Sequence, residues 1–230
     1  MTVMELAMAM TVGLIVITGV FTMLDTSVRL NTGVMSKTDA MQRGRLAMDT
    51  ITQELRSQVC LNNLNNPAIV ATKATGDTVT FYSDFSSADG DKPPEKRTLT
   101  FDRTNGNITT KIYRTAKLKP LPADFPLNPS VTQLRLENAQ LQKKTSGEEI
   151  PFLQYFAYKW VGDRPVAEEV LTPAANGLNA AQAARVARID INFTSRPTGA
   201  KDDKKGVRLS DQIMVRHADP NLSVPDPRCV

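Results

Sequence analysis

The first 24 residues carry the longest apolar run of the chain. From Leu6 to Leu24 there are 19 residues without a charge, and 14 of them are apolar. Coiled as a helix with a rise of about 1.5 Å per residue, this run spans roughly 29 Å, close to the ~30 Å hydrocarbon core of a bilayer. The pattern therefore predicts one helix, within residues 1–24, that is long enough to cross a membrane.

After Leu24 the apolar residues recur with the period of a helix. No proline precedes Pro67, so nothing in this region forces a helix to end. One face carries Val34, Met41, Met48, Ile51, Leu55 and Val59, and the opposite face carries Lys37, Arg43, Asp49, Gln53 and Arg56. Residues 25–60 are thus predicted to form the amphipathic second half of the same helix, which must protrude because it far exceeds the size of a small domain.

The pattern changes at residues 62–67, Asn-Asn-Leu-Asn-Asn-Pro, which favour a turn. Beyond them, alternation of apolar and polar residues predicts strands at Thr78–Ser83, Arg97–Asp102, Ile108–Thr115, Val131–Leu136, Phe152–Val161, Arg188–Ser195 and Val207–His217. The clearest alternation places Ile189, Ile191 and Phe193 on the inner face. Residues 61–230 are therefore expected to form a β-rich head.

Turn residues refine this expectation. Asn105-Gly106 lies between two predicted strands and predicts a hairpin with a type I′ turn. Residues 84–96, 116–130 and 162–184 are expected as surface loops, with a short helix at Asn179–Ala184. The predicted fold class is α+β, a long protruding N-terminal helix packed on a mostly antiparallel sheet.

Charge and cysteine content give conflicting indications of where the head lies. The net charge is only +4, and the lysine clusters are small, scattered and partly balanced by acids, which disfavours nucleic acid as a partner. The basic residues Arg29, Lys37, Arg43 and Arg45 follow the apolar run and are typical of a cytoplasmic flank. The two cysteines, Cys60 and Cys229, instead predict one disulfide and a head outside the cytoplasm, the alternative being two unrelated buried thiols.

Residues with catalytic chemistry are sparse. The only histidine, His217, ends a strand-like run without partners for acid–base work, and we interpret it as a surface or edge residue. No phosphate-binding glycine loop, nucleophile elbow or zinc-type cysteine cluster occurs. The acids at 84, 89 and 91 around Gly90 do not follow the spacing of a calcium loop and are interpreted as a polar turn. We expect no enzyme activity, no cofactor and no metal.

Glu5 is the one charge ahead of the apolar run. A carboxylate buried in a bilayer or an apolar bundle is costly unless it is paired. In a polymer of identical chains, the α-amino group of the next chain's Met1 could supply the partner, and the pair would set the register between chains. The alternative is a carboxylate that lies at the bilayer surface, and position alone does not decide between them.

Two stretches resemble a known family. Residues 1–16, Met-Thr-Val-Met-Glu-Leu-Ala-Met-Ala-Met-Thr-Val-Gly-Leu-Ile-Val, are similar to the mature N-terminus of type IV pilins and type II secretion pseudopilins. Residues 45–56, Arg-Leu-Ala-Met-Asp-Thr-Ile-Thr-Gln-Glu-Leu-Arg, resemble a stretch of the J-type and W-type minor members. The family usually begins with Phe, where this chain has Met1, and the frequent proline late in the apolar run is missing.

The resemblance implies a role in assembly. It places the family's assembly glutamate on Glu5 and its processed, usually N-methylated first residue on Met1. The expected partners are identical subunits in a helical homopolymer, the inner membrane before assembly, the pilus assembly machinery and a prepilin peptidase. The expected location is an extracellular filament at the cell surface. The alternatives are a minor pilin or pseudopilin and a membrane-anchored binding domain, such as an adhesin or a DNA-capture module, that never polymerises.

Overall fold

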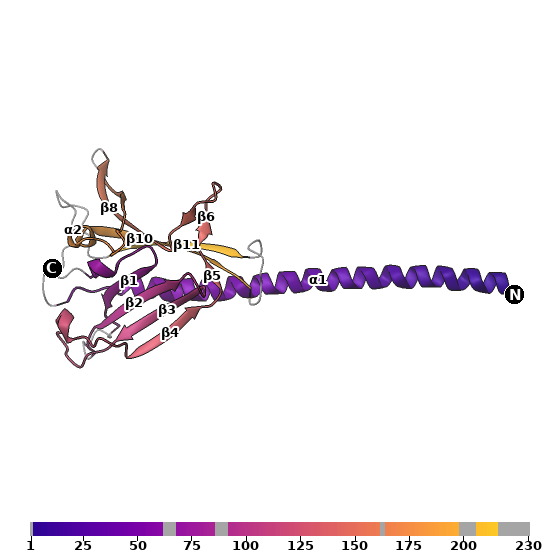
Figure 1. Ribbon diagram of the computed structural model, residues 1–230, viewed down its shortest axis with the longest axis horizontal. Helices are drawn as coiled ribbons and strands as arrows, with labels where there is room; N and C mark the ends of the chain where they lie inside the picture. Colours follow the sequence, from indigo (N-terminus) through magenta and orange to yellow (C-terminus); the bar gives the residue numbers. More distant parts are fainter. Residues whose placement is uncertain (1, 62–67, 86–91, 162–163, 198–205, 216–230) are drawn as a thin grey trace.

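The protein consists of one long helix and a β-rich head (Figure 1). The computed structural model describes residues 2–61, 68–85, 92–161, 164–197 and 206–215. Helix α1 runs from Val3 to Arg56, 54 residues, with Thr2 as its N-cap. At its other end the Ser57 amide donates to the Gln53 carbonyl at 3.1 Å. The predicted long, protruding helix is confirmed.

The head covers only the last part of α1. The buried side of the helix begins at Ala40 and continues through Gly44, Ala47, Met48, Ile51, Thr52, Glu54 and Leu55. Val34 is 64% exposed and Met41 36% exposed, although their spacing places them on the predicted buried face. Periodicity identifies the face of a helix, but it cannot show where along the helix the covering domain begins. The interpretation of Val34 as a core-facing residue is therefore wrong.

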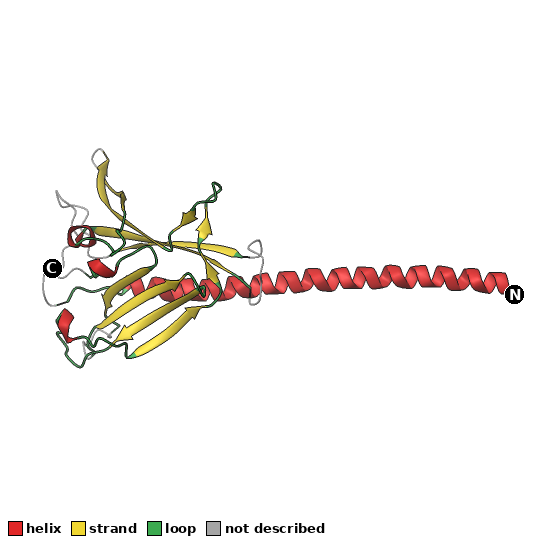
Figure 2. Ribbon diagram, in the orientation of Figure 1, coloured by secondary structure: helices red, strands yellow, loops and turns green. Residues whose placement is uncertain are grey.

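Two antiparallel sheets make up most of the head (Figure 2). The first has the order β1-β2-β3-β4, formed by Thr78–Ser83, Glu95–Asp102, Asn107–Tyr113 and Val131–Leu136. The second has the order β11-β10-β8-β9, formed by Val207–Met214, Val186–Ser195, Leu153–Val161 and Arg164–Leu171. Strand β5 (Ala139–Gln140) pairs with β10. The α+β class and all seven predicted strands are confirmed, though the last strand ends at Met214.

Smaller elements join these strands. Strand β6 (Gln142–Lys143) pairs with β7 (Glu149–Ile150). Two short 3-10 helices occur, η1 (Ala71–Lys73) and η2 (Pro122–Asp124). Helix α2 (Ala180–Ala184) begins after the N-cap Asn179, as predicted.

Two local predictions are wrong. Strand β9 lies within the segment expected as a loop, because backbone pairing with β8 does not require the alternation that the sequence lacks there. The β2–β3 hairpin forms, but not through a type I′ turn, since Gly106 has φ +66° while Asn105 does not have a positive φ. Instead the Asp102 carboxylate accepts hydrogen bonds from the Thr104 amide at 2.8 Å and from Asn105 Nδ2 at 2.7 Å, which holds a wider turn.

One apolar core joins the inner faces of both sheets to the buried side of α1. Met48, Ile51 and Leu55 of the helix belong to the same buried cluster as residues of both sheets. Phe152 links the sheets, because its ring lies 5.6 Å from that of Phe101 and 6.2 Å from that of Phe193. Ile189, Ile191 and Phe193 are fully buried, as their alternation predicts. The core therefore fixes the helix to the head and leaves residues 3–39 projecting.

Candidate assembly surface

The projecting part of α1, residues 3–39, is here called the projecting helix. Its surface is continuously apolar over residues 6–24, and an exposed ion pair between Asp25 and Arg29 follows. Its large apolar side chains are each 52% to 87% exposed: Val3, Met4, Leu6, Met8, Met10, Val12, Leu14, Ile15, Val16, Ile17, Val20, Phe21, Met23, Leu24, Val28, Leu30, Val34 and Met35. Soluble monomers rarely expose apolar patches larger than a few hundred Å². The helix is long and apolar enough to cross a membrane. This surface requires lipid or other protein chains to cover it.

Six hydroxyl groups of the projecting helix are satisfied by the helix itself. Each of the following donates to a carbonyl three or four residues earlier, at 2.8 to 3.0 Å: Thr11, Thr18, Thr22, Thr26, Thr32 and Ser36. An unbonded hydroxyl in an apolar medium costs free energy, and these internal bonds remove most of that cost. These six hydroxyl groups are thus compatible with burial in lipid or between helices.

Three glycines of the projecting helix have no contact that explains them within the chain. A Cβ atom built on Gly13, Gly19 or Gly33 would meet nothing within 4 Å. Glycine in a helix interior costs about 1 kcal/mol relative to alanine. These positions therefore weaken the isolated helix and leave its backbone open to close approach from outside.

Glu5 closes a capping box at the start of α1. Its Oε2 accepts a hydrogen bond from the Thr2 amide at 2.8 Å, and the Thr2 hydroxyl accepts one from the Glu5 amide at 3.4 Å. The carboxylate thus lies on the positive end of the helix dipole. Within the described residues, Oε1 has no partner. Met1 lies outside the described residues, so its pairing with Glu5 stays a prediction.

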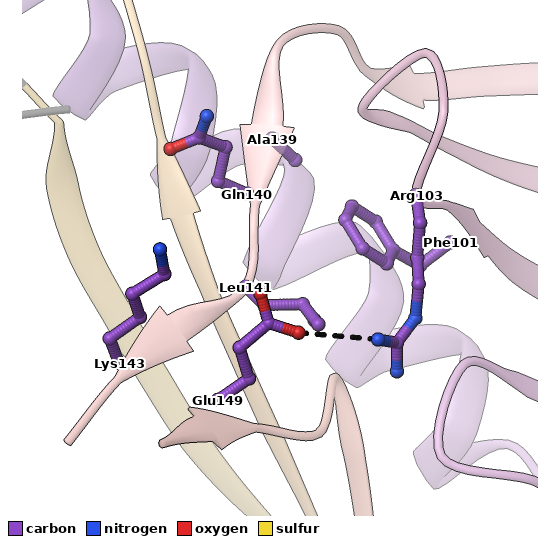
Figure 3. A pocket seen from close by; sticks show the side chains of 7 residues that line it. All are labelled: Phe101, Arg103, Ala139, Gln140, Leu141, Lys143 and Glu149. Carbon is purple, nitrogen blue, oxygen red and sulfur yellow. Dashed lines mark hydrogen bonds and ion pairs between the residues drawn. The ribbon is translucent and has the colours of Figure 1, made fainter. Parts of the chain in front are cut away.

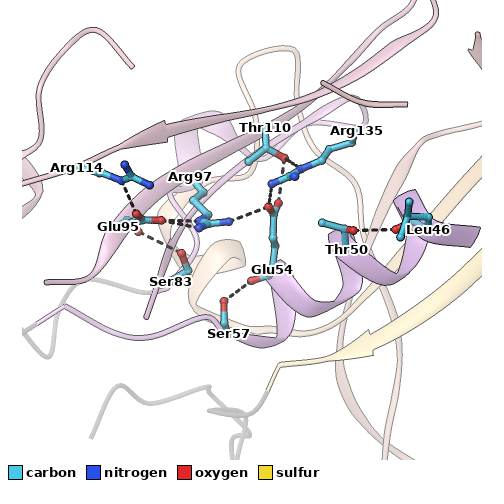
Figure 4. A network of polar contacts seen from close by, with 10 residues as sticks. All are labelled: Leu46, Thr50, Glu54, Ser57, Ser83, Glu95, Arg97, Thr110, Arg114 and Arg135. Atoms are coloured by element: carbon cyan, nitrogen blue, oxygen red, sulfur yellow. Dashed lines mark hydrogen bonds and ion pairs between the residues drawn. The ribbon is translucent and has the colours of Figure 1, made fainter. Parts of the chain in front are cut away.

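The carboxylate of Glu54 is the main polar link between α1 and the first sheet (Figure 4). Its side chain is 4% exposed and accepts hydrogen bonds from Arg97 Nη1 at 2.8 Å, from Arg135 Nη2 and from the Thr110 hydroxyl at 3.0 Å. Arg97 and Arg135 come from β2 and β4, and Thr110 comes from β3 between them. A buried charge with this many partners fixes the position of the helix on the sheet.

Glu95 extends this network toward the surface. Arg97 donates to its Oε2 from Nη2 at 2.6 Å, and Arg114 donates to its Oε1 from Nε at 2.8 Å. Burial opposes ionisation of Glu95, but the hydrogen bonds from Arg114 and Arg97 outweigh it and lower the pKa of the carboxyl. The Arg97 guanidinium also stacks on Phe85, 4.1 Å from the ring centroid. Glu54 itself belongs to the family-like stretch 45–56, but nothing in the local sequence pattern indicates that its carboxylate is buried and paired.

A second contact holds α1 against the other sheet. The Ser195 hydroxyl of β10 donates to the Ala40 carbonyl at 2.7 Å, and both residues are fully buried. One helical turn further on, a Cβ atom on Gly44 would lie 2.4 Å from Leu209 Cδ1 and 2.7 Å from Ser195 Cβ. Only glycine permits this close approach of helix and sheet.

The head also contains a small polar cavity of about 170 Å³ between the β2–β3 turn and strands β5 to β7 (Figure 3). Arg103 projects into it and donates to Glu149 Oε2 at 3.3 Å. Hydrogen bonds to Asp77, at 2.6 and 3.0 Å, raise the pKa of Arg103 despite partial burial. Since carboxylates already satisfy its charged group, we assign no chemistry to this cavity. In the described ranges, no three metal-ligating side chains come together.

Several predicted positions lie outside the described residues. Cys60 is half buried just after α1, but Cys229 lies outside the described residues, so the disulfide stays a prediction. His217 and the acids at 89 and 91 also lie outside the described residues.

The comparisons with known proteins find no matching family model and no matching curated protein.

Proposed function

We propose that the chain is the structural subunit of a type IV pilus-like filament, stored in the membrane and then packed helix to helix through the projecting helix. The observation that carries the proposal is the exposed apolar surface of residues 6–24 on the projecting helix, which no other described residue of the chain covers. The resemblance of residues 1–16 to pilin N-termini implies the arrangement of the subunits in the filament, with the helices inside and the heads outside.

Glu5 is assigned the role of setting the register between subunits. Its capping box uses Oε2, which leaves Oε1 to accept the α-amino group of the next subunit's Met1. The local bond from the Thr2 amide and the positive end of the helix dipole also stabilise the negatively charged carboxylate before assembly. Hydrophobic burial then supplies most of the stability of the filament, while the ion pair selects one register.

A minor, pilus-initiating role is the second candidate, and one observation favours it. The stretch that resembles J-type and W-type members contains Glu54, the buried carboxylate that joins the helix to β2, β3 and β4. Abundance separates the two roles, because a main subunit makes up most of a sheared filament and a minor one is present in a few copies.

The test compares three variants for filaments sheared from cells and for protein retained in the membrane. Glu5→Ala and Glu5→Gln both remove the charge, but glutamine keeps an oxygen that can accept the Thr2 amide bond. We expect both to abolish or strongly reduce filaments without loss from the membrane. The control is Glu148→Gln, whose side chain is 66% exposed on the head. Normal filament yield from either Glu5 variant would rule out the pairing, and membrane-bound protein that never yields filaments would favour an anchored binding domain.

A further inference from the structure

A second exposed apolar surface lies far from the projecting helix, on the loop that joins β3 to β4. This segment, residues 114–130, is called the distal loop. Three of its leucines are exposed: Leu118 by 60%, Leu121 by 51% and Leu127 by 96%. Figure 1 shows the loop, coloured pink around η2, at the end of the head away from the N-terminus. The loop that carries these exposed leucines therefore lies at the opposite end of the molecule from the projecting helix.

Packing and hydrogen bonds hold the backbone of the distal loop that carries these leucines in one conformation. Phe125 is buried, and its ring packs 5.4 Å from that of Tyr82. Lys117 pairs with Asp124, whose Oδ2 also accepts the Leu121 amide at 2.8 Å. At the end of the loop, the Ser130 amide donates to the Ile112 carbonyl at 2.8 Å. Exposure of the leucines is thus a property of the folded loop.

The charges of the distal loop are distributed unevenly between its surface and its base. The side chains of Arg114 and Lys117 are 58% and 65% exposed, and Lys119 is also exposed. The carboxylates that pair with two of them, Glu95 and Asp124, are each only 18% exposed. The cationic partner of each pair is therefore the more exposed one, and together with Lys119 these side chains complement an anionic surface.

The backbone of the loop favours lipid over a pairing strand as the occupant. Prolines at 120, 122, 126 and 129 lack the N–H group, and the amides of Leu121 and Asp124 are bonded within the loop. An added strand would need free backbone donors at regular intervals. A lipid surface needs no such regular series of donors.

We propose that the distal loop is a lipid-binding element that inserts its leucines into an anionic bilayer while its lysines and Arg114 contact the headgroups. Apolar side chains flanked by basic ones are the usual composition of such interfacial segments. Because the loop and the projecting helix lie at opposite ends, one chain can contact two membranes, or a filament can present the loop to a surface beyond the cell.

The experiment uses the full chain inserted into phosphatidylcholine vesicles, with the heads shown to be outside by protease access. Protein-free vesicles of equal parts phosphatidylcholine and phosphatidylglycerol are then added. Binding of these vesicles to the protein-bearing ones, here called capture, is measured by energy transfer between fluorescent lipids in the two kinds of vesicle. We expect capture of the anionic vesicles, weaker capture at high salt, and a loss of at least about tenfold for Leu118→Ser/Leu127→Ser. Lys119→Glu should also reduce capture.

The matched control is Val170→Ser, which removes an apolar side chain that is 59% exposed on β9, outside the loop. It should capture vesicles as the unchanged chain does. Absence of capture by the unchanged chain, equal capture of neutral vesicles, or unchanged capture by the leucine double variant would each overturn the proposal. None of these outcomes depends on filament formation, so the assembly role is tested separately.

Discussion

The Glu54 carboxylate on α1 accepts a hydrogen bond from Arg97 Nη1 on β2 at 2.8 Å, in a site where the two side chains are 4% and 11% exposed. This pair joins the helix that we assign to assembly with the head that it would display. Any force on the projecting helix therefore acts on the first sheet through a buried, charged contact as well as through the apolar core.

Glu54→Ala should destabilise the protein strongly, because it leaves Arg97 and Arg135 without their shared buried carboxylate. We expect a loss of roughly 3–5 kcal/mol in the free energy of unfolding, measured by denaturant titration of the full chain in detergent micelles. Glu54→Gln should lose less, since it keeps the volume and an acceptor oxygen. Glu148→Ala, which breaks an exposed pair with Lys144, should change stability by less than about 1 kcal/mol. Equal effects at Glu54 and Glu148 would contradict the assigned role.

Gly44→Ala and Gly33→Ala place the same methyl group on the same helix in different surroundings. At Gly44 the added Cβ would overlap Leu209 and Ser195, so we expect a loss of about 1–3 kcal/mol from overpacking. At Gly33 the space is open, and higher helix propensity should stabilise the monomer by up to about 1 kcal/mol. Thermal unfolding of monomers in detergent measures both. Stabilisation at both positions would show that helix propensity, not packing, determines the response.

Glu95 should make stability depend on pH. Its pKa in the folded state is lowered from the ordinary value of 4.5, so the charged form is favoured by folding. The contribution is fully present above about pH 4.5 and is lost as the pH falls through the lowered pKa. We expect the unfolding midpoint of the unchanged chain to fall more steeply below pH 4.5 than that of Glu95→Gln. Parallel curves for the two proteins would show that Glu95 does not contribute.

The pairing of Cys60 with Cys229 can be tested directly. Peptide mapping without reductant should recover the two cysteines in one linked fragment. In the chain-entropy model, a closed loop of about 170 residues corresponds to roughly 5 kcal/mol, so reduction should lower the unfolding midpoint clearly. Cys60→Ser and Cys229→Ser should cause similar losses, and the double variant should lose no more than either. Recovery of both thiols free would refute the bridge.

Much of the fold follows from local pattern. Uncharged residues at 6–24 predict the membrane-length segment, the absence of proline predicts its continuation, and alternation predicts seven strands. The sequence does not predict strand β9, because residues 164–171 lack alternation of apolar and polar positions. The strand forms through its backbone pairing with β8. The turn at Gly106 was predicted as the wrong type, because the Asp102 side chain stabilises a wider loop that a dipeptide signal does not reveal.

The sequence alone determined that this protein has an apolar segment requiring lipid or partner chains, because composition and helical period depend only on neighbouring residues. Only the tertiary structure shows that the head begins to cover the helix at Ala40, because the strands that cover it are distant in the chain. It also decided that Glu54 is buried among two arginines of β2 and β4, and that Glu5 has a local partner in Thr2. Burial and pairing of charges depend on which groups come together in space. Local sequence patterns do not reveal which distant groups these are.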